Sequence, residues 1–194
     1  KEMAKIRRLG ILALGITGAV VATACDAVHV KTKTLSYPKP LYWKQAGWVF
    51  PGFTAAFVSM AVVYAGLAKP LETKLEIEQS QLSGDTHSFV ESLSYFAIAY
   101  MMSGFGNYHP KLLCFIFYGT FVLRLGVTYE KEWLAVIALL LAFGGMFTEG
   151  LMSKCGLVDY REPEIFDVPW WLGGVYMHGA FALREGMRYL VYTK

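Results

Sequence analysis

Charged residues are scarce in this chain, and their scarcity indicates which solvent the folded protein meets. Lys, Arg, Asp and Glu make up 17% of its 194 residues, against about 25% in an average soluble domain. Hydrophobic residues make up 55% and aromatic residues 15%, and the mean hydropathy is +0.40. Because a surface that faces acyl chains does not need charged side chains, the composition predicts an integral membrane protein.

Several chemical signatures are also missing from the sequence. The net charge is only +3 and the basic residues are scattered, which excludes a basic stripe for nucleic acid. There is no histidine pair spaced for zinc, no aspartate-rich magnesium motif, no nucleophile elbow and no phosphate-binding loop. Cys25, Cys114 and Cys155 lack paired spacing and are expected to pack as small apolar residues. We therefore expect no metal site, no cofactor and no catalytic residues, and hence a protein that is not an enzyme.

Long apolar runs recur along the chain, and a helix needs about 20 apolar residues to cross the hydrocarbon core. Six runs cover residues 9–25, 48–68, 88–106, 112–129, 133–152 and 169–192. Residues 70–87 form the longest hydrophilic connection, and the short charged turn at 130–132 predicts a tight hairpin. The expected fold class is therefore all-α, a single domain that forms a polytopic bundle of six transmembrane helices.

The spacing of glycines and the number of spans add two structural expectations. Gly10, Gly15 and Gly18 in the first run would let a neighbouring helix approach closely. An even number of spans puts both termini on one side of the membrane. Basic residues near both ends favour the cytosolic side for the termini.

Ionisable residues inside the predicted spans are candidates for function, because burying them in lipid is costly unless they find a partner. Asp26 and Arg124 lie near span ends, where a polar head can reach the interface. Glu149, His178 and Glu185 are stronger candidates; His178 lies about midway through the last run, and Glu185 shares its helical face. Such a face could transfer protons or bind a polar lipid head. It could equally hold helices together through interhelical hydrogen bonds.

Aromatic residues gather on the third and fourth spans. They could line a cavity for an apolar ligand, or simply face lipid and neighbouring helices. The residues concerned are Tyr95, Phe96, Tyr100, Phe105, Phe115, Phe117, Tyr118 and Phe121.

Three segments, taken in order, resemble the Insig (insulin-induced gene protein) family of six-span membrane proteins, which has prokaryotic members. Residues 46–51, AGWVFP, are similar to the family's A-W-W-V-P-P at the start of span two, and IR at 6–7 matches the family's I-R at span one. Residues 156–164, GLVDYREPE, followed by WL at 171–172, are similar to G-V-Y-Q-Y-T-S-P-D and its following W-L. RYL at 188–190 is similar to the closing R-Q-L. The resemblance covers nearly the whole chain.

The resemblance implies a protein that binds a sterol or diacylglycerol-like lipid within the membrane and meets a membrane-protein partner. Phe96 falls at a phenylalanine that lies against the sterol in the family, and Glu130 at an aspartate that binds the partner. The family's glutamine and threonine on span four fall at Leu113 and Phe117, and its tryptophan falls at Gly126. The expected location is the endoplasmic reticulum in a eukaryote and the plasma membrane in a prokaryote.

Together, the residues and the resemblance give one set of ligand-binding candidates and one candidate for partner binding, Glu130. The ligand-binding candidates are Phe96, Tyr100, Phe117, Tyr118, Glu149 and His178.

Three functions stay open at this stage. The first is an Insig-like lipid sensor or regulator without catalytic activity. The second is a small membrane enzyme that acts on an isoprenoid or another lipid, with acid and base roles for Glu149, Asp159, Glu164 and His178. The third is an accessory subunit of a larger membrane complex.

Overall fold

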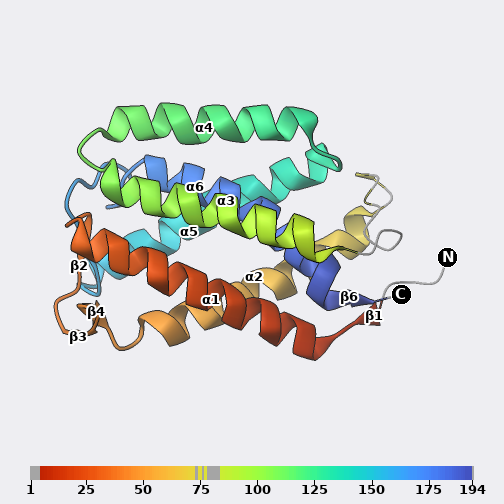
Figure 1. Ribbon diagram of the computed structural model, residues 1–194, viewed down its shortest axis with the longest axis horizontal. Helices are drawn as coiled ribbons and strands as arrows, with labels where there is room; N and C mark the ends of the chain where they lie inside the picture. Colours follow the sequence, from red (N-terminus) through yellow and green to blue (C-terminus); the bar gives the residue numbers. More distant parts are fainter. Residues whose placement is uncertain (1–4, 73, 76, 78–83, 194) are drawn as a thin grey trace.

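Six helices form the body of the protein in the computed structural model, which describes residues 5–72, 74, 75, 77 and 84–193 (Figure 1). The all-α membrane bundle predicted from the sequence is confirmed. The predicted connection at 70–87 lies partly outside the described residues. The helices are α1 (Arg8–Lys31), α2 (Val49–Leu71), α3 (Thr86–Phe105), α4 (Pro110–Val127), α5 (Lys131–Lys154) and α6 (Trp171–Gly186), which continues as a π-helical turn (Met187–Val191).

Four of these helices, α1, α2, α4 and α5, are long and apolar enough to cross a membrane. Helix α6 has 16 residues, and α3 is less apolar because it includes serines and Glu91. Apolar side chains cover the outside of the bundle; Phe115 is 78% exposed and Leu123 is 72% exposed. Such a surface suits acyl chains, so the chain is an integral membrane protein. The number of crossings stays a prediction.

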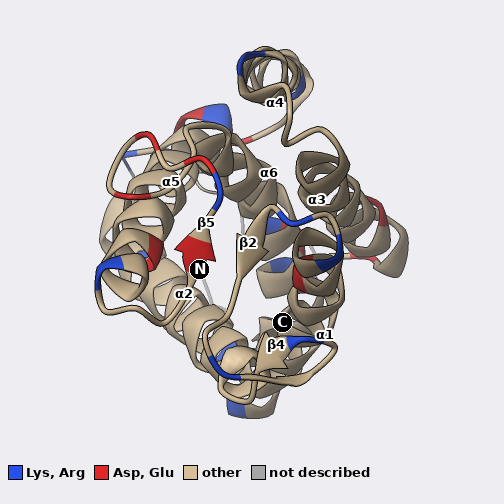
Figure 2. Ribbon diagram, turned by 90° about the vertical axis from the view of Figure 1, so that its left-hand side faces the viewer, with Lys and Arg blue, Asp and Glu red and all other residues tan. Residues whose placement is uncertain are grey.

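Helix α6 lies inside the bundle and α4 lies at its outer edge, as the end-on view shows (Figure 2). Most of the side chains of α6 are buried, because the helix packs against α3, α4 and α5. Helix α2 packs chiefly on α1. The helix that is shortest and least typical of a membrane span is therefore the one that the other helices shield from lipid.

The glycines of α1 allow the close approach that their spacing predicted. A Cβ atom added to Gly15 would lie 2.5 Å from Cγ2 of Val58, and one added to Gly18 would lie 2.9 Å from the ring of Phe57. Both contacts are far shorter than carbon–carbon van der Waals distances. The α1–α2 interface therefore depends on small residues, as in other closely packed membrane helices.

Short strand pairs close the two ends of the bundle. At one end β1 (Lys5–Ile6) pairs with β6 (Tyr192–Thr193), which places the segment before α1 beside the segment after the π-helical turn. At the other end β2 (Leu35–Ser36) pairs with β5 (Asp159–Tyr160), and β3 (Pro40–Tyr42) pairs with β4 (Gln45–Ala46). The second end is therefore covered by two loops that are far apart in the sequence.

Local sequence explains where several helices begin. The Asp85 carboxylate accepts a hydrogen bond from the Ser88 backbone N–H at 2.8 Å and so caps α3. Pro110 occupies the first turn of α4, where its missing N–H leaves no helical hydrogen bond unmade. Glu130, in left-handed conformation with φ of 49°, forms the tight hairpin between α4 and α5.

Candidate functional site

A cavity of about 340 Å³ lies between α1, α2, α3, α5 and α6, beneath the loops that β2 and β5 hold together. Its volume falls within the range of about 300–1,000 Å³ that is usual for ligand pockets. Most of its wall is apolar, and its polar groups gather near the closed end. The wall is formed by Ala22, Asp26, Tyr37, Trp48, Val49, Gly52, Phe53, Ala56, Phe57, Met60, Phe96, Tyr100, Thr148, Glu149, Met152, Leu157, Val158, Leu172, Val175 and Tyr176.

The first polar group at the closed end is the carboxylate of Asp26, on the last turns of α1, which is only 2% exposed. Oδ2 of Asp26 accepts hydrogen bonds from the Tyr37 hydroxyl at 2.9 Å and from Nε2 of Gln45 at 2.6 Å. Oδ1 lies 3.5 Å from the hydroxyl of Tyr100 on α3. A loop and two helices therefore converge on this single carboxylate.

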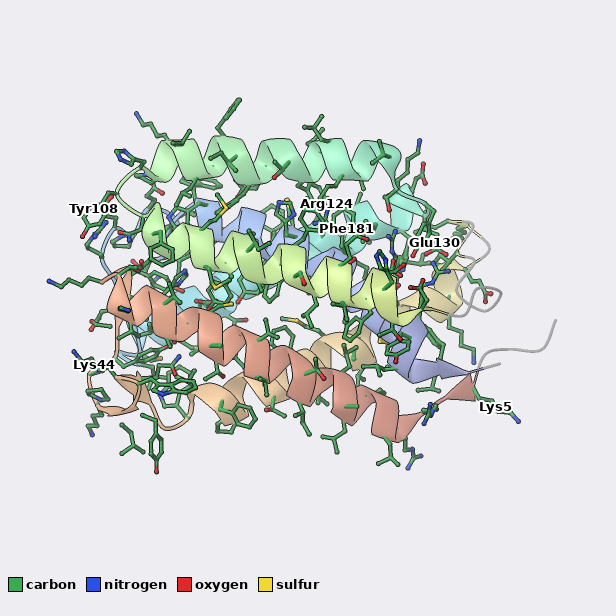
Figure 3. All side chains as sticks on the ribbon, viewed as in Figure 1. Lys5, Lys44, Tyr108, Arg124, Glu130 and Phe181 are labelled. Carbon is green, nitrogen blue, oxygen red and sulfur yellow. The ribbon has the colours of Figure 1, made fainter. Side chains whose placement is uncertain are left out.

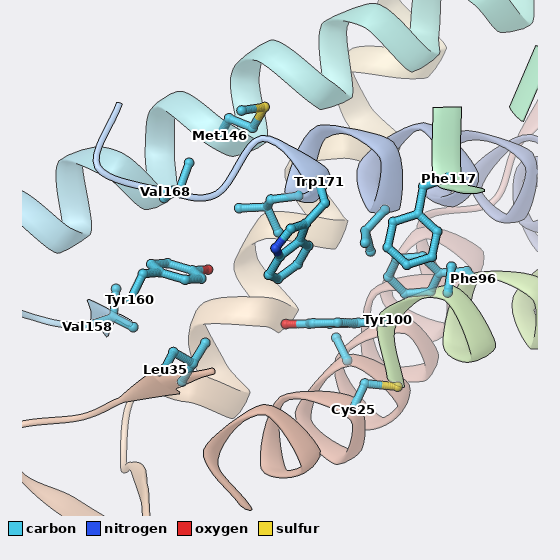
Figure 4. Close-up of a cluster of buried hydrophobic side chains, with 14 of the residues drawn as sticks. Cys25, Leu35, Phe96, Tyr100, Phe117, Met146, Val158, Tyr160, Val168 and Trp171 are labelled. Carbon is cyan, nitrogen blue, oxygen red and sulfur yellow. The ribbon is translucent and has the colours of Figure 1, made fainter. Parts of the chain in front are cut away.

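The second polar group is the carboxylate of Glu149 on α5. The hydroxyls of Tyr160, in β5, and of Tyr176, on α6, each donate a hydrogen bond to it. In Figure 4 the hydroxyls of Tyr100 and Tyr160 point toward one another from opposite sides of the buried cluster. The two carboxylates and their tyrosines therefore occupy one region of the fold.

The tyrosines in the covering loops act as hydrogen-bond donors. Burial and, secondly, the neighbouring Asp26 carboxylate raise the pKa of Tyr37 far above its ordinary value. Burial and the Glu149 carboxylate do the same to the pKa of Tyr160. Both hydroxyls therefore stay protonated and donate to carboxylates, which fixes the loops to α1 and α5.

A smaller apolar cavity of about 50 Å³ lies farther from the polar end. It shares Phe57, Met60, Phe96 and Tyr176 with the larger cavity, so the two spaces meet along the same side chains. Its remaining wall is almost entirely aliphatic and aromatic. The larger cavity therefore has a polar end and an apolar remainder, next to a second apolar space, an arrangement that suits an amphipathic molecule.

Three of the six predicted ligand-binding residues line the larger cavity. Phe96 and Tyr100 reach it from α3, and Glu149 reaches it from α5. Phe96 also borders the smaller cavity. The structure thus brings these three side chains to one space, although no sequence pattern links α3 with α5.

The other three predicted residues, Phe117, Tyr118 and His178, lie at the interface of α4 and α6, away from the cavity wall. The Tyr118 hydroxyl donates to the Trp170 carbonyl at 2.7 Å. Nδ1 of His178 lies 2.9 Å from Nη1 of Arg124, and its Nε2 lies 3.1 Å from the Phe117 carbonyl. These groups hold α4 against α6, which is the packing role that the sequence left open.

Glu130, the predicted partner-binding residue, is half-buried at the end of the bundle that carries the termini. Figure 3 places it at the same end as Lys5 and opposite Lys44 and Tyr108. This end also contains Arg184, whose guanidinium lies 3.8 Å from the centre of the Tyr129 ring. Glu130 is therefore distant from the polar end of the cavity.

The sequence prediction for Asp26 is wrong. A carboxylate near a span end was expected to reach the interface, but α1 continues to Lys31 and the covering loops enclose the side chain. Gln45, Tyr160 and Tyr176 were not predicted as site residues from the sequence. The available signal was a set of tyrosines in the two loops and in α6, but no spacing in the sequence connects them.

Comparison with known proteins places this geometry among solved structures. Scans against protein-family models and curated proteins find no match. The chain is similar to the crystal structure of the mycobacterial Insig homolog MvINS from Mycobacterium vanbaalenii, with a TM-score of 0.74, 19% identity and 95% of each chain covered. A cross-linked trimer of MvINS gives a TM-score of 0.72 at 18% identity, covering 94% of this chain and 95% of that one. The chain therefore has the fold of an Insig homolog, as the sequence resemblance predicted.

Proposed function

We propose that this protein is an Insig-like lipid sensor or regulator that holds one amphipathic lipid, of the sterol or diacylglycerol type, in its central cavity. The single observation that carries the proposal is the cavity itself, apolar along its length and polar at its closed end. Transfer of an apolar lipid body from the bilayer into the cavity is favourable only if the cavity fits it closely. The buried polar groups then fix the orientation of the head.

The position of the cavity also supports this proposal. Helix α2 supplies one wall through Phe53, Ala56 and Phe57 but packs chiefly on α1. A lipid between α2 and α5 would therefore give α2 a second packing partner besides α1. Its presence would change how firmly α2 is held, which is the kind of change that a sensor needs.

The direct test is to identify lipids that remain with the protein. The full chain is purified in a mild non-ionic detergent, and its bound lipids are measured by native mass spectrometry and by extraction. The expected result is about one molecule of an enriched lipid class per chain, with a composition unlike that of the bulk membrane. A bound fraction with the composition of the bulk membrane contradicts the proposal.

Two neighbouring alanines on α2 provide a matched pair of variants. Ala56 lines the cavity, whereas Ala55 is exposed on the outer side of the same helix. We expect Ala56→Trp to fill the cavity and to lose most of the retained lipid, and Ala55→Trp to keep it. Equal retention in the two variants would place the lipid outside the cavity and refute the proposal.

The geometry does not favour the enzymatic alternative. The Glu164 carboxylate accepts a hydrogen bond from the Trp170 backbone N–H at 3.0 Å, and His178 bonds to α4. Asp159 lies in β5 on the outer side of the loops, and Glu149 lies inside. The four acid and base candidates therefore serve separate local structures instead of one reaction centre.

A sensor needs a partner that responds to the bound state, and Glu130 is our candidate for that contact. Glu130 lies in the α4–α5 hairpin, so a partner that binds there need not contact the cavity or the outer faces of the helices. Crosslinking in native membranes, with Glu130→Ala compared with wild type, tests the assignment. An unchanged set of crosslinked membrane proteins would remove Glu130 from the proposal.

A further inference from the structure

The side chains at the closed end of the cavity include acidic residues but no basic ones among the described lining residues. The carboxylates of Asp26 and Glu149 both face this space, from α1 and α5. No lysine or arginine occurs among the described residues that line it. Three basic residues, Lys33, Lys44 and Arg161, line a separate outer pocket that also borders Tyr37 and Tyr160. No basic side chain among the described lining residues therefore neutralises these two carboxyl groups.

The hydrogen-bond donors at this end are already used within the protein. The hydroxyls of Tyr37 and Tyr100 and the amide of Gln45 are already directed at Asp26. The hydroxyls of Tyr160 and Tyr176 are directed at Glu149. What these groups offer to a ligand is the remaining lone pairs of the carboxylate and hydroxyl oxygens, which accept hydrogen bonds. A head group that donates hydrogen bonds fits this arrangement, and an anionic head group does not.

Aromatic rings complete the same end of the cavity. The rings of Tyr37 and Trp48 meet edge to face with centroids 5.7 Å apart, and both residues line the space. Tyr100, which reaches Asp26, lines it as well. Aromatic faces attract cations through their negative electrostatic potential, and the attraction is stronger where water is excluded.

We propose that the cavity binds a cationic amphiphile, an aminolipid with a primary ammonium head, more tightly than a neutral or anionic lipid with the same apolar body. The ammonium supplies three hydrogen-bond donors and a positive charge to the space between Asp26 and Glu149. This inference rests on the proposed function, because it requires a lipid in the cavity, and it changes the preferred head group from the neutral hydroxyl of a sterol or diacylglycerol to an ammonium.

Three probes with the same apolar chain test the head-group preference: dodecylamine, dodecanol and dodecanoate. Each is titrated into the purified full chain in a neutral detergent, and one-to-one adducts are quantified by native mass spectrometry. Because opposite charges attract strongly where the effective dielectric constant is low, we expect the dissociation constant of dodecylamine to be at least about tenfold below that of dodecanol. Dodecanoate should bind most weakly of the three. Equal binding of dodecylamine and dodecanol overturns the inference but leaves the proposed function standing.

Variants then assign the preference to the two carboxylates. Asp26→Asn and Glu149→Gln keep the side-chain shapes, and each should reduce the preference for dodecylamine over dodecanol by about fivefold or more. Glu132→Gln, an exposed position on the same helix as Glu149, should keep the wild-type preference. A preference that survives in both cavity variants overturns the inference. Failure of all three probes to bind wild-type protein would count against the proposed function itself, and the head-group inference would fall with it.

Discussion

Two adjacent glycines on α5 allow a sharp test of the packing around the cavity. A Cβ atom on Gly145 would lie 2.5 Å from Cε2 of Tyr176, the tyrosine that binds Glu149. A Cβ atom on Gly144 would meet nothing within 4 Å. The same substitution, glycine to alanine, therefore has opposite consequences at two neighbouring positions.

The magnitudes follow from the contacts. Gly144→Ala should raise the free energy of unfolding by about 0.5–1 kcal/mol, because alanine loses less conformational entropy in a helix. Gly145→Ala makes the same gain but forces the Tyr176 ring aside, and such overpacking costs about 1–3 kcal/mol. Pulling the hydroxyl away from the Glu149 carboxylate costs about 1.5–3 kcal/mol more. We therefore expect Gly145→Ala to lose roughly 2–5 kcal/mol overall.

Unfolding of the two variants and the wild type in mixed detergent micelles measures these differences. The titration uses a denaturing detergent, and loss of helix and loss of the tryptophan environment are followed separately. The lipid retained by each variant is measured in parallel, because Tyr176 also lines the cavity. Gly145→Ala as stable as Gly144→Ala, with its lipid retained, would refute the packing of Tyr176 against α5.

Two further predictions concern groups outside the cavity. Arg184 is 3% exposed and donates to the Tyr129 carbonyl at 2.6 Å and to Glu185 at 3.0 Å. Arg184→Met leaves Glu185 buried without this cation, so it should lower the free energy of unfolding by about 3–5 kcal/mol in the same assay. A loss below the experimental error would show that Glu185 needs no cation. The Ser88 backbone N–H and hydroxyl hold the pKa of Asp85 below its ordinary value. The capping contribution to α3 is therefore present above the ordinary pKa and is lost as the pH falls through the lowered one. The protection factors of amides in the first turn of α3, measured relative to intrinsic exchange, should fall over that range in wild type but not in Asp85→Asn, and identical pH profiles would contradict the cap.

The sequence predicted the architecture because hydrocarbon restricts what a backbone can do. A segment of about 20 apolar residues must satisfy its own hydrogen bonds, so each long run becomes a helix. Gly15 and Gly18 even indicated where α1 would meet a neighbour, and that contact is present. The charged turn at 130–132 indicated the hairpin between α4 and α5. These features are local and need no knowledge of the other helices.

The site could be predicted only in part. Glu149 and His178 were both ionisable candidates within predicted runs, yet Glu149 borders the cavity and His178 contacts α4. In a soluble helix the polar face reveals its orientation, but a membrane helix is apolar on nearly all sides. The rotation of α5 and α6 about their axes was therefore not encoded in any pattern that the sequence alone displays.

The amino-acid sequence by itself determined that this is a membrane bundle of helices with an Insig-like order of motifs. Tertiary structure alone decided that Asp26 and Glu149 share one buried end, because loops more than 100 residues apart in the sequence pair as β2 and β5 over it. A local pattern fixes which segments are helical, since helical hydrogen bonds are local. The position of a binding site depends instead on how distant segments pack, and that is settled only when the whole chain has folded.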